Sequence, residues 1–200
     1  MTVTASNYAP VANHFYQTEP WATEALLRHF PVAGLTVWEP AAGGHLMAGA
    51  LKAGGAEVWT SDIAEYGKCH DFPNHDFTTK GFPLPLGCDA IITNPPYGKG
   101  NRLAVRFAEL ALDRCDGMVA LLLTAKFDFG KTRRHLFQDN PRFMAKIALL
   151  DRISWAGNGE TGTEDHAWYV WGPKGFGPAR MLWAAKLSTP QPNADEGDGK

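Results

Sequence analysis

Short, nearly unbroken apolar runs alternate along this chain with stretches whose apolar residues recur at helical spacing. The runs predict strands, because strands buried on both faces of a parallel sheet have few polar positions. The predicted strands are residues 35–39, 57–63, 89–93, 118–124, 146–151, 166–171 and 180–184. Helical spacing predicts helices over residues 19–29, 45–51 and 102–113. Strands that alternate with helices indicate an α/β domain with a mostly parallel sheet.

The two ends of the chain lack this pattern. Residues 1–13 show no periodicity, and we expect a flexible N-terminus. The Pro, Asn, Asp and Gly residues within 188–200 predict a disordered acidic tail. Residues 14–187 then form one domain, and 44% hydrophobic residues in a chain of 200 suit a single sizeable core.

Composition narrows the class of protein. No apolar stretch reaches the length of a membrane span and the N-terminus is polar, so we expect neither a membrane segment nor a signal peptide. Three cysteines without Cys-x-x-Cys spacing indicate no disulfide framework, and a reducing cytoplasm is the natural compartment. The segments Cys69-His70-Asp71 and His75-Asp76 match no zinc spacing, so no metal is predicted.

Charge is unevenly distributed although the net charge is −2. Residues 1–98 hold 4 Lys/Arg and 9 Asp/Glu, whereas residues 99–152 hold 11 and 6. An acidic half would suit a cationic ligand, and a basic segment would suit phosphates. Solvated helix faces would give the same counts, so charge alone decides nothing.

The run at residues 90–93 stops at two consecutive prolines, in Asn94-Pro95-Pro96-Tyr97. A proline cannot donate to a strand ladder and pushes the preceding residue toward extended geometry, so this backbone is stiff. A polar amide, carbonyls and an aromatic ring are thereby held at the carboxyl edge of the sheet, where open α/β folds bind ligands. The alternative is a Pro-Pro turn that only caps a strand.

Asn94-Pro95-Pro96-Tyr97 resembles the catalytic motif of S-adenosylmethionine-dependent amino-methyltransferases, above all those that methylate adenine N6 in DNA. The resemblance implies that the Asn94 side-chain oxygen and the Pro95 carbonyl accept hydrogen bonds from the target amine, while Tyr97 stacks on the base. It also implies that Asn94 contacts the cofactor. Two acceptors favour a more tetrahedral nitrogen, whose lone pair can then attack the methyl group. A neutral amide is not a base at pH 7, so proton loss should follow methyl transfer.

The first strand runs into a small-residue loop, where glycines let the backbone approach a ligand. This loop resembles the family's cofactor-binding loop, although an ordinary connection is the alternative. The family often has glycine two positions after Gly43, where this chain has His45. Either Gly44 takes over that role, or His45 adopts a conformation that glycine usually fills. The loop residues implied to bind S-adenosylmethionine are Glu39, Pro40, Ala41 and Gly43, with Glu39 near its amino group.

Asp62 ends the second strand about 20 residues past the glycine loop, where an acid can bind ribose hydroxyls. Ile63 could pack on the adenine, and the Gly-x-Gly-x-x-Gly of NAD enzymes is absent. Asp76-Phe77 resembles the family's Asp-Phe pair, which contacts the adenine of the cofactor. Asp71-Phe72 competes for this assignment, and the distance onward to Asn94 favours Asp76.

Ahead of the first strand, Tyr16-x-Thr18-x-Pro20 resembles the family segment that contacts the methionine part of the cofactor. Thr18 is also a plausible N-cap of the helix over residues 19–29, and Pro20 suits its first turn. A capped amphipathic helix alone would explain the pattern equally well.

Basic residues follow the catalytic loop and are interleaved with Phe127, Phe129 and Phe137. Such interleaving suits phosphate contacts and base stacking, but a helix with one packed and one solvated face produces it too. The candidate nucleic-acid-binding residues are Lys99, Arg102, Lys126, Lys131, Arg133 and Arg134.

Together the motifs predict a Rossmann-like class I methyltransferase, with a mostly parallel seven-stranded sheet and helices on both faces. The implied reaction is methylation of adenine N6 in DNA, with the base flipped out of the duplex. Little chain remains for a recognition domain, so we expect short or relaxed recognition through residues 126–142 and 156–165 or through a second subunit. A homodimer is compatible with this. RNA adenine and protein glutamine are rival substrates, and a non-catalytic binding protein is the alternative from another class.

Overall fold

The computed structural model describes residues 16–155, 160–173 and 177–187. The predicted flexible N-terminus and acidic tail therefore lie outside the described residues, as does part of the predicted recognition loop at 156–165. In the described part, no helix combines the length and apolar character that crossing a membrane requires.

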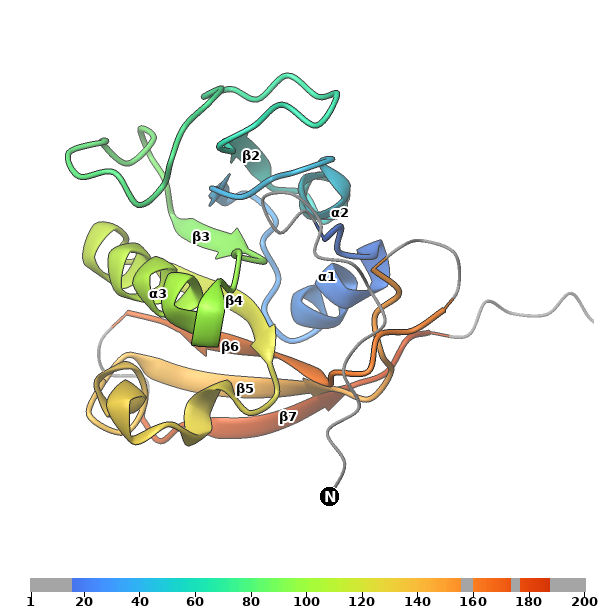
Figure 1. Cartoon of the computed structure of the whole chain (residues 1–200), viewed down its shortest axis with the longest axis vertical. Coiled ribbons are helices and arrows are strands. Elements are labelled where there is room, and N and C mark those ends of the chain that lie inside the picture. Colours follow the sequence, from blue (N-terminus) through green and yellow to red (C-terminus); the bar gives the residue numbers. More distant parts are fainter. Residues whose placement is uncertain (1–15, 156–159, 174–176, 188–200) are drawn as a thin grey trace, which may run out of the picture.

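Seven strands form one sheet, in the order β2-β1-β3-β4-β6-β5-β7 (Figure 1). The strands are β1 (Thr36–Glu39), β2 (Glu57–Thr60), β3 (Ala90–Thr93), β4 (Met118–Thr124), β5 (Phe143–Leu149), β6 (His166–Trp171) and β7 (Arg180–Ala184). β6 runs antiparallel to both of its neighbours, and all other pairs are parallel. This confirms the predicted mostly parallel seven-stranded sheet.

Helices cover both faces of the sheet, as predicted (Figure 1). Helices α1 (Pro20–Leu27) and α2 (Leu46–Ala53) pack on one face, and α3 (Arg102–Arg114) packs on the other. Successive side chains of a strand point to opposite faces. In β4, Ala120 and Leu122 therefore belong to the first core and Val119, Leu121 and Leu123 to the second.

Two local features differ from what the sequence suggested. Residues 126–142, for which a helix with one packed and one solvated face was one alternative, form two short 3-10 turns, η3 (Phe127–Phe129) and η4 (Lys131–Leu136). Strand β5 spans Phe143–Leu149 rather than residues 146–151, because Phe143 already pairs with Trp171 of β6. The preceding Arg142 is buried and donates to the carbonyls of Leu112, Gly117 and Gly172. This guanidinium is part of the core and not of a basic surface.

Helix α1 also begins differently from the prediction. Its N-cap is Glu19, which makes no side-chain capping bond, and Pro20 occupies the first turn. The hydroxyl of Thr18 accepts a hydrogen bond from the side chain of Asn94 instead. The N-terminal segment is thus tied to the carboxyl edge of the sheet.

Candidate active site

Polar side chains lie at the ends of three adjacent parallel strands, β2, β1 and β3, at one edge of the sheet. Glu39 ends β1 opposite Thr60 of β2, Asp62 follows β2, and Asn94 follows β3. Because parallel strands end at the same edge, residues from distant parts of the chain meet there.

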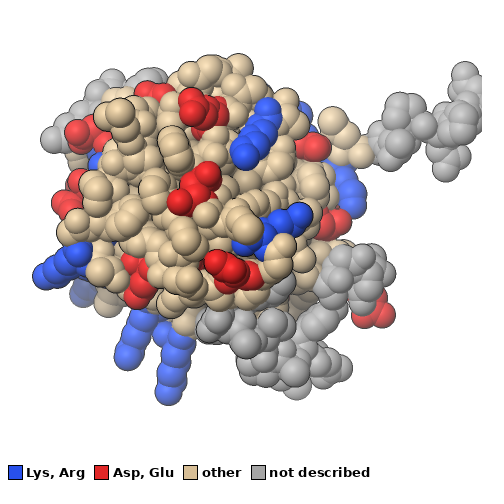
Figure 2. Space-filling model, turned by 90° about the horizontal axis from the view of Figure 1, so that it is seen from above, with Lys and Arg blue, Asp and Glu red and all other residues tan. Residues whose placement is uncertain are grey.

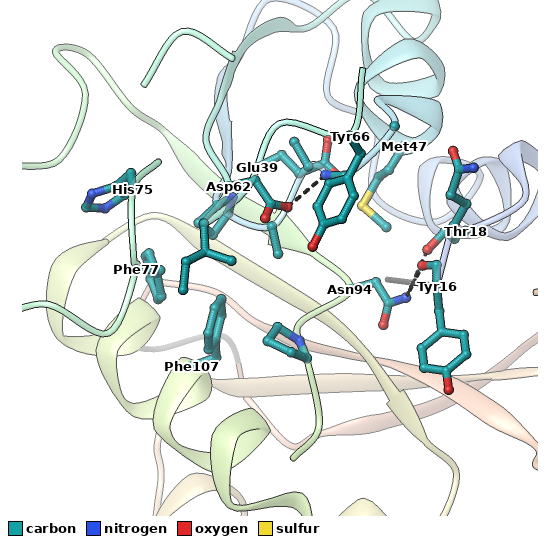
Figure 3. A pocket seen from close by; sticks show the side chains of 18 of the residues that line it. Tyr16, Thr18, Glu39, Met47, Asp62, Tyr66, His75, Phe77, Asn94 and Phe107 are labelled. Atoms are coloured by element: carbon teal, nitrogen blue, oxygen red, sulfur yellow. Dashed lines mark hydrogen bonds between the residues drawn. The ribbon is translucent and has the colours of Figure 1, made fainter. Parts of the chain in front are cut away.

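A cavity of about 300 Å³ opens at this edge (Figure 3). All eleven residues predicted to contact S-adenosylmethionine line it: Tyr16, Thr18, Glu39, Pro40, Ala41, Gly43, Asp62, Ile63, Asp76, Phe77 and Asn94. Its lining also includes Tyr66, Met47 and Phe107, which the sequence patterns did not single out. We refer to it as the first cavity.

Glu39 lies at the floor of the first cavity with 2% of its surface exposed. Burial, together with the nearby Asp62 carboxylate, raises the pKa of Glu39 well above its usual range. Its Oε2 atom has no hydrogen-bond partner among the described residues. A buried acceptor without a partner is costly, so this position fits a ligand that brings a donor, above all a cationic amine.

Asp62 joins the two loops that form the rim of the first cavity. Its Oδ2 accepts from the Gly43 N–H at 2.9 Å, and its Oδ1 accepts from the Ala64 N–H at 3.3 Å. Gly43 has φ 48°, a left-handed conformation that glycine adopts without strain. Each carboxylate oxygen keeps a further lone pair, which suits the hydroxyl donors of a ribose.

Asp76 and Asp71, the two alternatives for the residue that contacts the cofactor's adenine, have different positions in the structure. Asp76 lines the first cavity, and its Oδ1 accepts from the backbone N–H and hydroxyl of Thr78 at 2.8 and 2.7 Å. Asp71 instead binds the backbone N–H and hydroxyl of Thr60, both at 2.8 Å, and braces β2. Next to Asp76, the ring of Phe77 packs against that of Phe107 with centroids 4.8 Å apart. An apolar wall beside an acceptor suits a purine with an exocyclic amine.

His45 follows the second of the two alternatives left open by the sequence. It has φ 66° and ψ 18° at the N-cap of α2, the left-handed conformation that glycine usually fills. Its Nε2 lies 2.9 Å from Nδ1 of His70, whose Nε2 lies 3.1 Å from the carbonyl oxygen of Ala64. Burial and the neighbouring His70 lower the pKa of His45. The imidazole pair links the glycine loop to the loop after β2.

A second cavity of about 290 Å³ adjoins the first. Tyr16, Asn94 and Pro96 line both cavities, so the amide of Asn94 stands at their junction. The remaining lining residues of the second cavity are Pro95, Tyr97, Thr124, Trp155, Gly162, Thr163, Glu164 and His166. The four residues of the predicted catalytic motif thus share one cavity.

Four aromatic rings from separate segments form much of the second cavity. Tyr97 stacks with His166 at a centroid distance of 6.2 Å, and its hydroxyl donates to the Leu122 carbonyl at 3.3 Å. Trp155 meets His166 edge-on at 4.9 Å and Tyr16 at 6.1 Å. Trp155 and His166 were not predicted, because no sequence motif marks them and only the folded chain brings them to Tyr97.

Two rings of this wall, Tyr97 and His166, have pKa values shifted toward the neutral form. Burial, helped by the Glu164 carboxylate, raises the pKa of Tyr97. Burial lowers the pKa of His166 to about 4. Nδ1 of His166 lies 3.0 Å from the Glu164 carbonyl, which requires Nδ1 to carry the proton. Neutral aromatic surfaces of this kind suit a flat, uncharged ring.

The candidate nucleic-acid-binding residues differ in their surroundings. Arg133 donates to the Phe127 carbonyl at 2.6 Å and lies over the Phe127 ring, and Arg134 pairs with Asp139 at 2.9 Å. The other candidates, Lys99, Arg102, Lys126 and Lys131, are exposed. On the face shown in Figure 2, basic and acidic side chains are interspersed and no continuous basic area forms.

Comparison with known proteins gives a fold and no close relative. No protein-family model and no curated protein sequence matches the chain. Solved structures do match: a candidate RNA methyltransferase from Pyrococcus horikoshii aligns with TM-score 0.65 and 15% identity, over 84% of this chain and 92% of that one.

Two longer structures match as well. A type I restriction-modification methyltransferase subunit from Streptococcus thermophilus aligns with TM-score 0.59 and 12% identity, over 92% of this chain. The chain spans about half of that subunit, 48%. A candidate class I S-adenosylmethionine-dependent methyltransferase from Listeria monocytogenes aligns with TM-score 0.56 and 12% identity, over 84% of this chain and 63% of that one. The chain therefore has the Rossmann-like fold of the class I S-adenosylmethionine-dependent methyltransferases.

Proposed function

We propose that this protein transfers a methyl group from S-adenosylmethionine to the N6 amino group of adenine in DNA, with short or relaxed sequence recognition. The observation that carries the proposal is the position of Asn94. Its amide lies where a cavity with nucleotide-binding character meets a cavity walled by aromatic rings. A transfer between two ligands requires such a junction.

The first cavity has the donor and acceptor set that S-adenosylmethionine needs. Glu39 offers its unpartnered oxygen to the amino group, Asp62 to the ribose hydroxyls, and Asp76 with Phe77 to the adenine. When bound, S-adenosylmethionine supplies an electrophilic methyl group. The acidic lining also favours a cationic cofactor over its neutral product.

Asn94 and Pro95 act on the amine that is to be methylated. The Asn94 Nδ2 donates to Thr18, and no described residue donates to its Oδ1, which leaves that oxygen to accept from the amine. Pro95 lines the second cavity, and its backbone carbonyl is the second acceptor that we propose for the amine. Neither group is a base at neutral pH, so the proton leaves the nitrogen after methyl transfer.

The second cavity favours a base over a glutamine side chain. Tyr97, Trp155 and His166 present ring surfaces, on which a nucleobase can stack with about 1–3 kcal/mol per base. An aliphatic amide gains little from such surfaces. RNA adenine remains the second candidate substrate, because the structural match from P. horikoshii is described as an RNA methyltransferase.

Methyl transfer from labelled S-adenosylmethionine to unmethylated DNA and to RNA tests the proposal. We expect label in DNA as N6-methyladenine, identified by mass spectrometry of the digested product. Asn94→Ala should lower kcat by about 10²–10³-fold, the usual effect of removing one preorganised polar group from a reacting centre. The variant should still bind the cofactor, which calorimetry would verify and which excludes misfolding.

Label in RNA but not DNA would transfer the proposal to RNA adenine. Transfer to neither, with tight cofactor binding in the wild type, would overturn the nucleic-acid substrate. An Asn94→Ala variant as active as the wild type would overturn the assigned site.

A further inference from the structure

The segment Tyr16 to Glu19 contacts three walls of the two cavities. The side-chain amide of Gln17 occupies the place of a Cβ on Gly44, and so lies directly on the glycine loop. Thr18 binds the side chain of Asn94. Glu19 Oε2 accepts from the Ser154 N–H at 2.8 Å, next to Trp155. Four consecutive residues thus connect the cofactor loop, the catalytic amide and the aromatic wall.

The contact with Asn94 decides which end of the amide faces the substrate. Its Nδ2 donates to the Thr18 hydroxyl at 3.1 Å and approaches the Tyr16 carbonyl at 3.5 Å (Figure 3). A hydroxyl can donate or accept, whereas a carbonyl can only accept. The carbonyl of Tyr16 therefore selects the NH₂ end of the amide, and the buried hydroxyl of Thr18 holds it there. A rotated amide would present N–H donors to an amine that itself donates.

We propose that Thr18 is a positioning residue for methyl transfer: it fixes the Asn94 amide so that Oδ1 faces the target amine. This inference rests on the proposed function and extends it to a residue that does not touch the reacting atoms. Thr18 is 5% exposed and comes from a segment 76 residues away in sequence, so the bond is a tertiary contact of the folded site.

Thr18→Val tests the inference, because valine has the shape of threonine without the hydroxyl. We expect kcat to fall about tenfold, the effect of one hydrogen bond, and the Kd of the cofactor to change by a smaller factor, because valine still fills the wall of the first cavity while the hydroxyl that holds Asn94 is lost. Thr18→Ser, which keeps the hydroxyl, should restore most of the lost rate. A merely structural role would not be rescued by serine and would change both constants together.

Thr23→Val is the matched control. Thr23 is fully buried in α1, and its hydroxyl has no partner among the described residues. It lines neither cavity, so the variant should keep both constants. An unchanged kcat in Thr18→Val, or equal losses in Thr18→Val and Thr23→Val, would overturn the inference.

A second readout keeps the inference separate from the proposed function. The Asn94 side-chain ¹⁵N–¹H₂ signals, assigned by their loss in Asn94→Ala, report the hydrogen bond without catalysis. Thr18→Val should shift them and Thr18→Ser should not. If the wild type methylates no nucleic acid, the proposed substrate fails while these signals still decide the positioning role. Unshifted signals in Thr18→Val would overturn it.

Discussion

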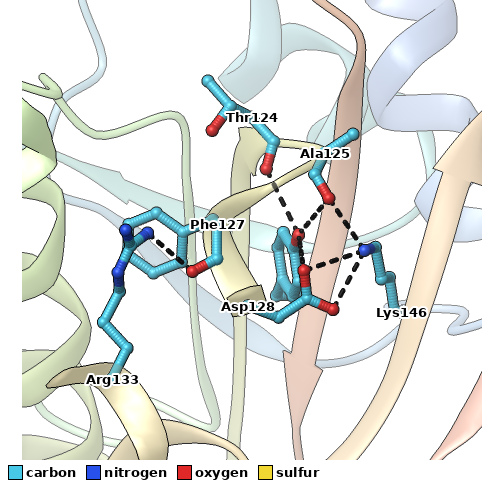
Figure 4. Close-up of polar contacts among 7 residues, drawn as sticks. Thr124, Ala125, Phe127, Asp128, Arg133 and Lys146 are labelled. Atoms are coloured by element: carbon cyan, nitrogen blue, oxygen red, sulfur yellow. Dashed lines mark hydrogen bonds and ion pairs between the residues drawn. The ribbon is translucent and has the colours of Figure 1, made fainter. Parts of the chain in front are cut away.

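Two carboxylates at the carboxyl ends of parallel strands, Asp128 after β4 and Glu39 at the end of β1, have opposite surroundings. Asp128, in η3 after β4, receives the Lys146 ammonium on both oxygens at 2.9 and 3.0 Å and the Tyr169 hydroxyl at 3.0 Å (Figure 4). Glu39, at the end of β1, faces the like charge of Asp62 and keeps an oxygen without a partner.

The difference separates a structural cluster from a binding site. Lys146 also donates to the carbonyl of Ala125 at 2.8 Å, and the Tyr169 hydroxyl oxygen lies 3.0 Å from the same carbonyl, so the cluster fixes the chain where it leaves β4. Every charge in it is paired within the fold. No contact among the described residues satisfies the buried Oε2 of Glu39, which also faces the like charge of Asp62. A buried ionisable group with such an unsatisfied oxygen indicates a functional site.

The largest expected effect is on the free energy of unfolding. Asp128→Asn removes the charge opposite Lys146 in a largely buried pair, with 13% and 22% of the two side chains exposed. We expect a loss of about 3 kcal/mol, measured by chemical denaturation. Asp139→Asn is the matched control, because its pair with Arg134 is about half exposed and should contribute less than about 1 kcal/mol. Equal losses would contradict the assignment of the Asp128 cluster.

The next largest effect is the dependence of the free energy of unfolding on pH. Burial lowers the pKa of His166 to about 4 from its usual 6.5. Between these values the unfolded chain binds the proton and the folded chain does not, so stability falls as pH drops below 6.5. At pH 5 this loss is about 2 kcal/mol. Denaturation of the wild type and His166→Phe at pH 7 and pH 5 would measure it. The variant should lose about 2 kcal/mol less between the two values, and an equal loss would refute this origin.

The smallest effect is on the salt dependence of DNA affinity, and it concerns two basic residues of the 3-10 turn η4. Lys131 is exposed, whereas Arg133 is bound to the Phe127 carbonyl. If Lys131 contacts a phosphate, Lys131→Ala should reduce the slope of log K for DNA against log salt by about 1. Arg133→Ala should instead lower the melting temperature and leave the slope unchanged. A reduced slope with an unchanged melting temperature for Arg133→Ala would reverse these roles.

The sequence predicts much of the fold because its strands are strongly marked. Strand β4 matches its predicted range, 118–124, since an unbroken apolar run fits a strand buried on both faces. The eleven residues that the family resemblance implies for the cofactor all line the first cavity. Several of them meet there because parallel strands place their ends at one edge, and their role in binding the cofactor stays a prediction.

The rest depends on contacts that no local pattern encodes. Residues 126–142 resemble a helix in composition, but Arg133 binds back to the Phe127 carbonyl and the chain forms two 3-10 turns. The aromatic wall requires Trp155 to lie beside Tyr16, and Glu19 bound to the Ser154 N–H provides that contact. Thr18 was a plausible helix cap from the sequence, yet its hydroxyl accepts a hydrogen bond from the side chain of Asn94, 76 residues away.

Calorimetric titration of S-adenosylmethionine into the wild type, Glu39→Gln and Asp128→Asn tests the central comparison most directly. Glu39→Gln removes the charge that we assign to the cofactor's amino group, so its Kd should rise about 10- to 100-fold, the effect of one charged hydrogen bond. Asp128→Asn should bind as the wild type does, despite its lower stability. Wild-type affinity in Glu39→Gln, or equal weakening in both variants, would contradict the assignment of the first cavity to the cofactor.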